Sequence, residues 1–129
     1  METRRFENIV IKWDKNYNGV EIKADGEHFI LDANPSYCMS WDDAMRFYDD
    51  LQFWKLPTVK QLEIVCKYFD KINEVIEENG GFKLIYAPYW SIEKKDEFNA
   101  RYFHMVFRCF DTNFKNFNYY VRAVSTILS

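Results

Sequence analysis

The sequence predicts an α+β fold in which two helices pack on a small antiparallel sheet, and three observations support this prediction. Aromatic residues make up 19% of the 129 residues, and about half of them lie between Phe82 and Tyr120, which favours strands there. Segment 40–79 repeats apolar residues at helical spacing. Near the N-terminus, Asp25-Gly26 separates two apolar-patterned runs, which is typical of a hairpin.

Length and composition set the broad class of protein. We expect residues 1–129 to form a single domain, and the formal net charge of −3 argues against a polycation made for nucleic acid or anionic membranes. No apolar run approaches the roughly 20 residues that cross a bilayer, and no signal peptide is recognised. We therefore expect a cytoplasmic protein without membrane contact, in which Cys38, Cys66 and Cys109 are buried, reduced thiols.

The N-terminal part is predicted to contain a strand over 8–13, a turn over 16–19 and then the hairpin at Asp25-Gly26. A type I′ turn at these two residues fixes which apolar residues face each other. The expected pairs are Ile22 with Phe29 and Val20 with Leu31. Because side chains alternate along a strand, these four share one face, and we expect only that face to be buried. The opposite face carries Glu21, Lys23, His28 and Ile30.

The first helix is expected to begin after Ser40, whose hydroxyl can accept a hydrogen bond from the first turn. Asp42 and Asp43 follow, where the helix dipole favours negative charge. The predicted buried stripe consists of Trp41, Ala44, Met45, Tyr48 and Leu51.

The second helix is expected to begin after Thr58, because Thr58 and Gln61 have the spacing of a capping box. Its apolar stripe continues to Asn79-Gly80, where glycine can take the left-handed conformation that ends a helix. The sequence therefore predicts one helix of roughly 20 residues. The stripe consists of Leu62, Val65, Cys66, Phe69, Ile72 and Ile76.

After Gly80-Gly81 the sequence changes to aromatic strands. Residues 102–110 alternate with the period of a single strand. The core-facing set is predicted to be Phe103, Met105, Phe107 and Cys109. A loop over 111–118 and a returning strand over 119–124 are expected to follow.

Four blocks of this sequence resemble known bacterial families. Residues 53–58 (Phe-Trp-Lys-Leu-Pro-Thr) are similar to a W-R-L-P-T signature shared by the formylglycine-generating, sulfatase-modifying family and the uncharacterised Lcl C-terminal domain family. Residues 89–91, 101–105 and 118–124 resemble blocks of the second family in the same order. The resemblance implies a C-type-lectin-like fold, with two helices on an irregular antiparallel sheet, an N-terminal hairpin and chain ends that pair near one another.

The patterns of catalysis and metal binding are missing from the sequence. His104 and Cys109 lie five residues apart on one predicted strand, so they are expected to point to opposite faces and to form no dyad. The two histidines and three cysteines lack zinc spacing, and no calcium signature is present. We therefore expect a protein that is not an enzyme and has no metal or cofactor. The enzyme alternative, a copper- or thiol-dependent relative of the formylglycine generators, depends on Cys109.

C-type-lectin-like folds typically present ligands on loops between the later strands, so the resemblance directs attention to 92–100 and 111–118. The second loop combines amides with aromatic rings, a mixture suited to a sugar, a peptide or a protein surface. Turn formation explains its asparagines equally well. The expected ligand-binding residues are Asn99, Arg101, Asn113, Phe114, Asn116 and Asn118. We thus expect a binding domain with a protein or carbohydrate ligand.

Two alternatives stay open. The chain could be a structural or assembly subunit whose interface includes these loops, and its oligomeric state is open. Segment 98–124 also carries four basic residues and one acidic residue among its aromatics, which is typical of single-stranded nucleic-acid binders. Core packing explains most of these rings, so nucleic acid is the least favoured partner.

Overall fold

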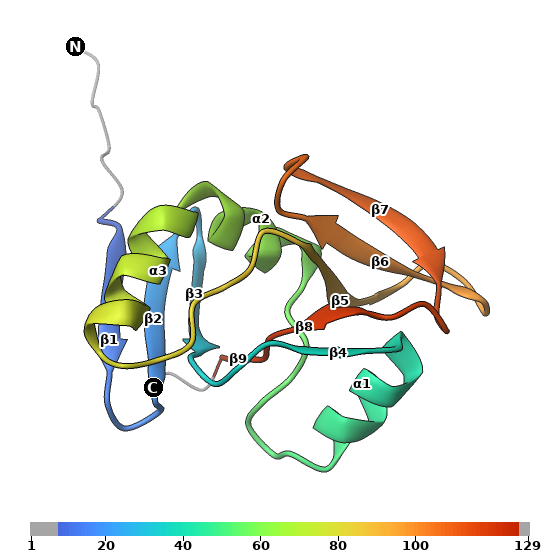
Figure 1. The fold of residues 1–129 in the computed structure, drawn as a ribbon, viewed down its shortest axis with the longest axis horizontal. Coiled ribbons are helices and arrows are strands. Elements are labelled where there is room, and N and C mark those ends of the chain that lie inside the picture. Colours follow the sequence, from blue (N-terminus) through green and yellow to red (C-terminus); the bar gives the residue numbers. More distant parts are fainter. Residues whose placement is uncertain (1–7, 127–129) are drawn as a thin grey trace.

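The computed structural model describes residues 8–126, which form an α+β fold with three helices and two sheets (Figure 1). The pairings between strands are antiparallel except for one parallel pairing in the second sheet. The α+β class is as predicted, but the structure has three helices and two sheets where the sequence predicts two helices and one small sheet. Within residues 8–126, no helix combines the length and the apolar character needed to span a membrane.

The first sheet is built around the predicted hairpin. Its strands, in order across the sheet, are β1 (Val10–Asp14), β2 (Gly19–Ala24), β3 (Glu27–Asp32) and β9 (Val124–Ser125). Asp25 and Gly26 have φ of 50° and 82°, as a type I′ turn requires, and the two predicted apolar pairs are confirmed. The expectation that only one face is buried is wrong, because Ile30 on the opposite face is fully buried. Ile30 pairs with Ser125 of β9, which makes β3 an inner strand of the sheet.

Helix α1 (Trp41–Asp49) begins where the sequence predicts. The side chain of Ser40 accepts a hydrogen bond from the backbone N–H of Asp43. Trp41, Ala44 and Tyr48 are buried as expected. Leu51 is exposed, since the helix ends before it reaches this position, so its predicted place in the stripe is wrong.

The predicted single long helix is wrong, because it is two helices. Helix α2 (Val59–Lys67) begins with the predicted capping box of Thr58 and Gln61, and α3 (Phe69–Glu78) follows after Tyr68. Tyr68 has φ −110° and ψ 27°, which interrupts the helical geometry. Helix α2 packs against the second sheet and α3 against the first, so one straight helix would not contact both. At the end of α3, Gly80 has φ 75°, the left-handed conformation expected there.

The second sheet contains a hairpin where the sequence predicts one strand. Its strands, in order across the sheet, are β4 (Tyr37–Met39), β8 (Tyr119–Val121), β5 (Pro88–Lys94), β6 (Asn99–His104) and β7 (Cys109–Phe114). The chain reverses between β6 and β7, where Arg108 has φ 56°. Phe103 and Met105 are buried as predicted, whereas Phe107 is 72% exposed and Cys109 is exposed. The alternation of predicted core-facing and other residues continues through the turn, so the pattern alone does not reveal that the chain reverses between β6 and β7.

The cysteines differ from the prediction in their burial. All three are free thiols, but Cys38 and Cys109 are exposed and Cys66 is partly buried. The thiol of Cys66 donates a hydrogen bond to the carbonyl of Met105, and burial raises its pKa. The expectation of buried thiols is therefore wrong for Cys38 and Cys109.

Candidate functional site

The predicted site residues are divided among the two faces of the β6–β7 hairpin and the loop that follows it. Asn99 and Phe114 are paired across the hairpin, whereas Asn113 pairs with Ala100 and so belongs to the opposite face. Asn113 and Phe114 therefore stand in β7, and Asn99 in β6, where the sequence predicts loops. Three further predicted residues are Arg101 in β6, and Asn116 and Asn118 in the exposed loop after β7. The structure does not gather the six into one site.

Two of the predicted amides bond to the protein itself. The side-chain amide of Asn99 donates to the Asp96 carboxylate at 3.0 Å, and this hydrogen bond is the main cause of a lowered Asp96 pKa. The Asn113 amide nitrogen donates to the Tyr119 hydroxyl at 2.8 Å. These contacts favour a structural role for both asparagines.

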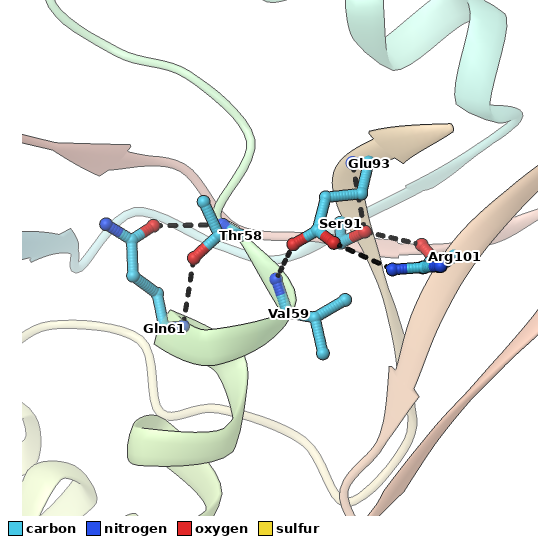
Figure 2. Close-up of polar contacts among 6 residues, drawn as sticks. All are labelled: Thr58, Val59, Gln61, Ser91, Glu93 and Arg101. Carbon is cyan, nitrogen blue, oxygen red and sulfur yellow. Dashed lines mark hydrogen bonds and ion pairs between the residues drawn. The ribbon is translucent and has the colours of Figure 1, made fainter. Parts of the chain in front are cut away.

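Arg101 is joined to the beginning of α2 through Glu93 (Figure 2). One Glu93 oxygen accepts from the Arg101 guanidinium at 3.2 Å, and the other accepts from the Val59 backbone N–H at 2.7 Å. The Ser91 hydroxyl donates to the Arg101 carbonyl and accepts from the Glu93 N–H. The carboxylate thus lies at the positive end of the α2 dipole, beside the capping box. The Arg101 guanidinium also lies over the Phe110 ring, 5.6 Å from its centroid.

Phe114 and Asn116 are the predicted residues that the structure does bring together. They line a hollow of about 450 Å³ together with Asp42, Glu97, Phe98 and Lys115. Backbone hydrogen bonds hold its walls: Lys115 donates to the Phe98 carbonyl at 2.9 Å, and Trp41 donates to the Lys115 carbonyl at 2.9 Å. The Lys115 ammonium donates to the Glu97 carbonyl at 2.7 Å. The hollow is therefore apolar at its rings and carries both signs of charge at its rim.

Most of an exposed aromatic surface, of which Phe98 and Phe114 line this hollow, lies outside the predicted site residues. Its five members are Phe98, Phe107, Phe110, Phe114 and Phe117, which are 66%, 72%, 52%, 58% and 50% exposed. We call them the phenylalanine surface. They come from β7 and from the turns next to it, and Figure 1 shows β7 as the outermost strand of the second sheet. The alternating pattern indicated core positions for Phe107, whereas the fold leaves it in solvent.

The outer backbone edge of β7 is already partly hydrogen-bonded. The Lys115 N–H points back toward the β6 side, so the alternate N–H groups of Thr112 and Phe114 point to the outer edge. The side chain of Asp111 accepts from Thr112 N–H, and that of Asn113 accepts from Phe114 N–H, each at 2.8 Å. Addition of a partner strand would have to displace these bonds, so the aromatic side chains are the more accessible contact surface.

His104 and Cys109 correct another prediction. They are partners across the β6–β7 hairpin, so they share a face of the sheet rather than pointing to opposite faces. His104 Nδ1 accepts the Val106 N–H at 3.2 Å, and its ring lies 4.4 Å from that of Phe107. Across residues 8–126, no three His, Cys, Asp or Glu side chains are grouped so that they could hold a metal ion.

These features define an α+β domain with an exposed aromatic surface at one edge of its second sheet. Comparison of the sequence with protein-family models matches no family, and comparison with curated proteins matches no relative. The functional assignment therefore depends on the geometry of the residues described above.

Proposed function

We propose that this protein is a non-enzymatic protein-binding domain and that the phenylalanine surface is its contact surface. The observation that carries this proposal is that five phenylalanines, each at least half exposed, surround one outer strand. Exposed apolar area marks interaction sites, and aromatic residues are enriched at the centres of interfaces. Taking about 200 Å² for a whole phenylalanine side chain, the five leave about 600 Å² exposed. This total is divided between the two faces of the hairpin, because the Phe107 ring lies 4.4 Å from that of His104, on the face opposite to Phe110 and Phe114.

The chemistry of this surface favours a protein over a carbohydrate. Phenylalanine rings offer no hydroxyl or N–H group to a sugar, and the amides of Asn99 and Asn113 are bonded to Asp96 and Tyr119. Charged groups such as Lys115 stand at the rim, as is common in protein interfaces. An apolar segment of a protein therefore fits better than a sugar.

The nucleic-acid alternative has less support. Of the four basic residues in segment 98–124, Arg122 is 1% exposed and Arg101 pairs with Glu93. The Lys115 ammonium is bonded to a backbone carbonyl and lies over the Trp41 ring. Few charges remain to follow a phosphate backbone.

We further propose that the fold is C-type-lectin-like and that the chain is related to the Lcl C-terminal domain family. The pairing of β9, at the C-terminal end of the described chain, with β3 of the N-terminal hairpin supports this. So does the burial of Trp90, Ser91 and Arg122, which belong to the resembling blocks. A cytoplasmic location is part of this proposal, and it agrees with the exposed free thiols.

A random peptide library displayed on phage tests the binding role. Peptides enriched on the immobilised chain are measured by fluorescence polarisation against wild type and against a Phe110→Ser, Phe114→Ser double variant. We expect at least a tenfold loss of affinity in this variant. The matched control changes two exposed phenylalanines elsewhere, Phe53→Ser with Phe82→Ser, and should bind like wild type. Failure to enrich any peptide, or equal binding by both double variants, would refute the proposal.

Sedimentation velocity of the same proteins distinguishes an assembly subunit. The exposed phenylalanines of β7 favour this second candidate, because the apolar side chains of two copies can pack together there. A concentration-dependent dimer of the wild type that is lost in the Phe110→Ser, Phe114→Ser variant would identify a second copy of this chain as the partner.

A further inference from the structure

A second cavity lies away from the phenylalanine surface and shares no residue with it. It is a cleft of about 230 Å³ between the β1–β2 turn, β4, α1 and the connection that follows α1. Five aromatic residues line it together with one carboxylate. They are Tyr17, Tyr37, Phe47, Tyr48, Trp54 and Asp32.

The rings of this aromatic cleft stand at steep angles to one another. The Tyr17 and Trp54 rings make an interplanar angle of 75° with centroids 6.4 Å apart. The Phe47 and Tyr48 rings make an angle of 88° with centroids 4.9 Å apart. Walls at such angles do not form a parallel slot for a flat ring, and they suit a rounded group instead.

The charge of the cleft favours a cation. Asp32 is its one residue charged at neutral pH, and no Lys, Arg or His is among its lining residues. Asn34 donates two hydrogen bonds to Asp32, both to Oδ1. The nearby Arg122 donates to the Ser36 hydroxyl and to backbone carbonyls instead. Among the described residues, the side-chain carboxylate of Asp32 thus accepts hydrogen bonds from Asn34 and forms no ion pair with Arg122.

Burial disfavours the ionised form of this carboxylate. It raises the pKa of Asp32, even though Arg122 acts in the opposite direction. A positively charged ligand would stabilise the ionised form, and its apolar substituents would contact the rings.

We propose that the aromatic cleft binds an alkylated ammonium group. Aromatic rings attract cations through the negative charge of their faces, and methylated ammonium groups combine a positive charge with an apolar, rounded surface. A single carboxylate among five aromatic side chains matches both properties. The same chemistry is offered by a free quaternary amine such as choline and by the side chain of a methylated lysine.

Titration of the ¹⁵N-labelled protein with choline chloride tests this assignment by NMR. We expect saturable shifts of the resonances of Tyr37 and Trp54. The neutral isostere 3,3-dimethyl-1-butanol, which has the same shape without the charge, should bind at least tenfold more weakly. Trp54→Leu should weaken choline binding at least tenfold, and the remote control Phe117→Leu should leave it unchanged.

Two further variants keep the test decisive. Asp32→Asn removes the charge at nearly constant volume and should reduce the preference for choline over the neutral isostere. If Trp54→Leu fails to fold, Tyr37→Ala replaces it, because Tyr37 is 48% exposed and its loss disturbs the core less. Tighter binding of a trimethyl-lysine peptide than of choline would identify a methylated protein as the source of the group. Equal binding of choline and its neutral isostere, or no saturable shift with either cation, would overturn the proposal.

Discussion

Replacement of Arg122 by lysine tests how the fold is held together. Arg122 is 1% exposed, and its guanidinium donates five hydrogen bonds that connect three segments of the chain. Their acceptors are the Ser36 hydroxyl (3.0 and 2.9 Å) and the carbonyls of Asp32 (3.0 Å), Phe82 (2.7 Å) and Lys83 (3.1 Å). Lysine keeps the positive charge but has only three donors, so Arg122→Lys separates donor geometry from charge.

The expected loss in the free energy of unfolding follows from the number of hydrogen bonds that lysine cannot make. An ammonium leaves at least two of the five bonds unmade, and a hydrogen bond to a charged group contributes about 1.5 to 3 kcal/mol. Arg122→Lys should therefore lower the free energy of unfolding by about 3 to 6 kcal/mol, out of the 5 to 15 kcal/mol typical of a domain. The matched control is Arg101→Lys, whose side chain is 41% exposed and pairs with Glu93. A partly exposed ion pair of this kind contributes about 0 to 1 kcal/mol.

Urea denaturation followed by tryptophan fluorescence measures both effects. We expect the midpoint to fall strongly for Arg122→Lys and little for Arg101→Lys, with similar m-values because the surface exposed on unfolding is the same. If Arg122→Lys does not fold, Ser36→Ala removes the acceptor of two of the bonds and should cost about 1 to 3 kcal/mol. An Arg122→Lys protein within about 1 kcal/mol of the wild type would refute the reasoning, since the bonds would then contribute little.

Three other changes have expected outcomes. Glu93→Gln removes the negative charge beside the Val59 N–H, so it should lower the free energy of unfolding, measured by urea denaturation, by about 0.3 to 1 kcal/mol. In about 1 M salt the loss should be smaller, and a loss that does not depend on salt would contradict the dipole argument. Burial raises the folded-state pKa of Asp32, so the ionised carboxylate lowers the stability of the fold above that pKa. Asp32→Asn should therefore raise the urea midpoint at pH 7. The difference in midpoint between variant and wild type should vanish below about pH 4, where the carboxyl group is protonated in both states. Asp111→Ala with Asn113→Ala frees two outer N–H groups of β7, so the double variant should self-associate more than wild type in sedimentation velocity. A double variant that stays as dissociated as wild type would show that these hydrogen bonds do not protect the strand edge.

Short-range chemistry explains which parts of the fold the sequence predicts well. The capping box of Thr58 and Gln61 and the cap at Ser40 depend on residues within one helical turn, and both are confirmed. The hairpin at Asp25-Gly26 depends on two residues that tolerate positive φ. Each signal is complete within a few residues, so tertiary packing has little left to decide.

The wrong predictions concern places where packing decides. The apolar stripe runs through Tyr68 without Gly or Pro, yet the helix breaks there because α2 and α3 pack on different sheets. The turn between β6 and β7 is equally hidden, since Arg108 rather than Gly takes the positive φ. Contacts between distant segments determine both features, and local sequence carries no sign of them.

The candidate sites were harder to predict than the fold. Polar loop residues suggested a site, but Asn99 and Asn113 make internal hydrogen bonds, and of the predicted residues only Phe114 lies on the phenylalanine surface. Strand alternation assigned Phe107 to the core, and only the strand order shows that β7 has no neighbour on its outer side. The aromatic cleft takes residues from separate segments of the chain, so no sequence window contains it.

The two surfaces also differ in how a ligand on each would affect local opening of the protein. The aromatic cleft needs the β1–β2 turn, β4 and α1 in their folded positions, because each contributes a wall. A ligand there stabilises only states in which these segments stay together, so it suppresses openings that separate α1 from the first sheet. The phenylalanine surface needs little more than the β6–β7 hairpin and its adjoining turns. A partner bound there protects that hairpin and leaves openings at α1 unchanged, so the proposed cation and the proposed protein partner stabilise different parts of the same fold.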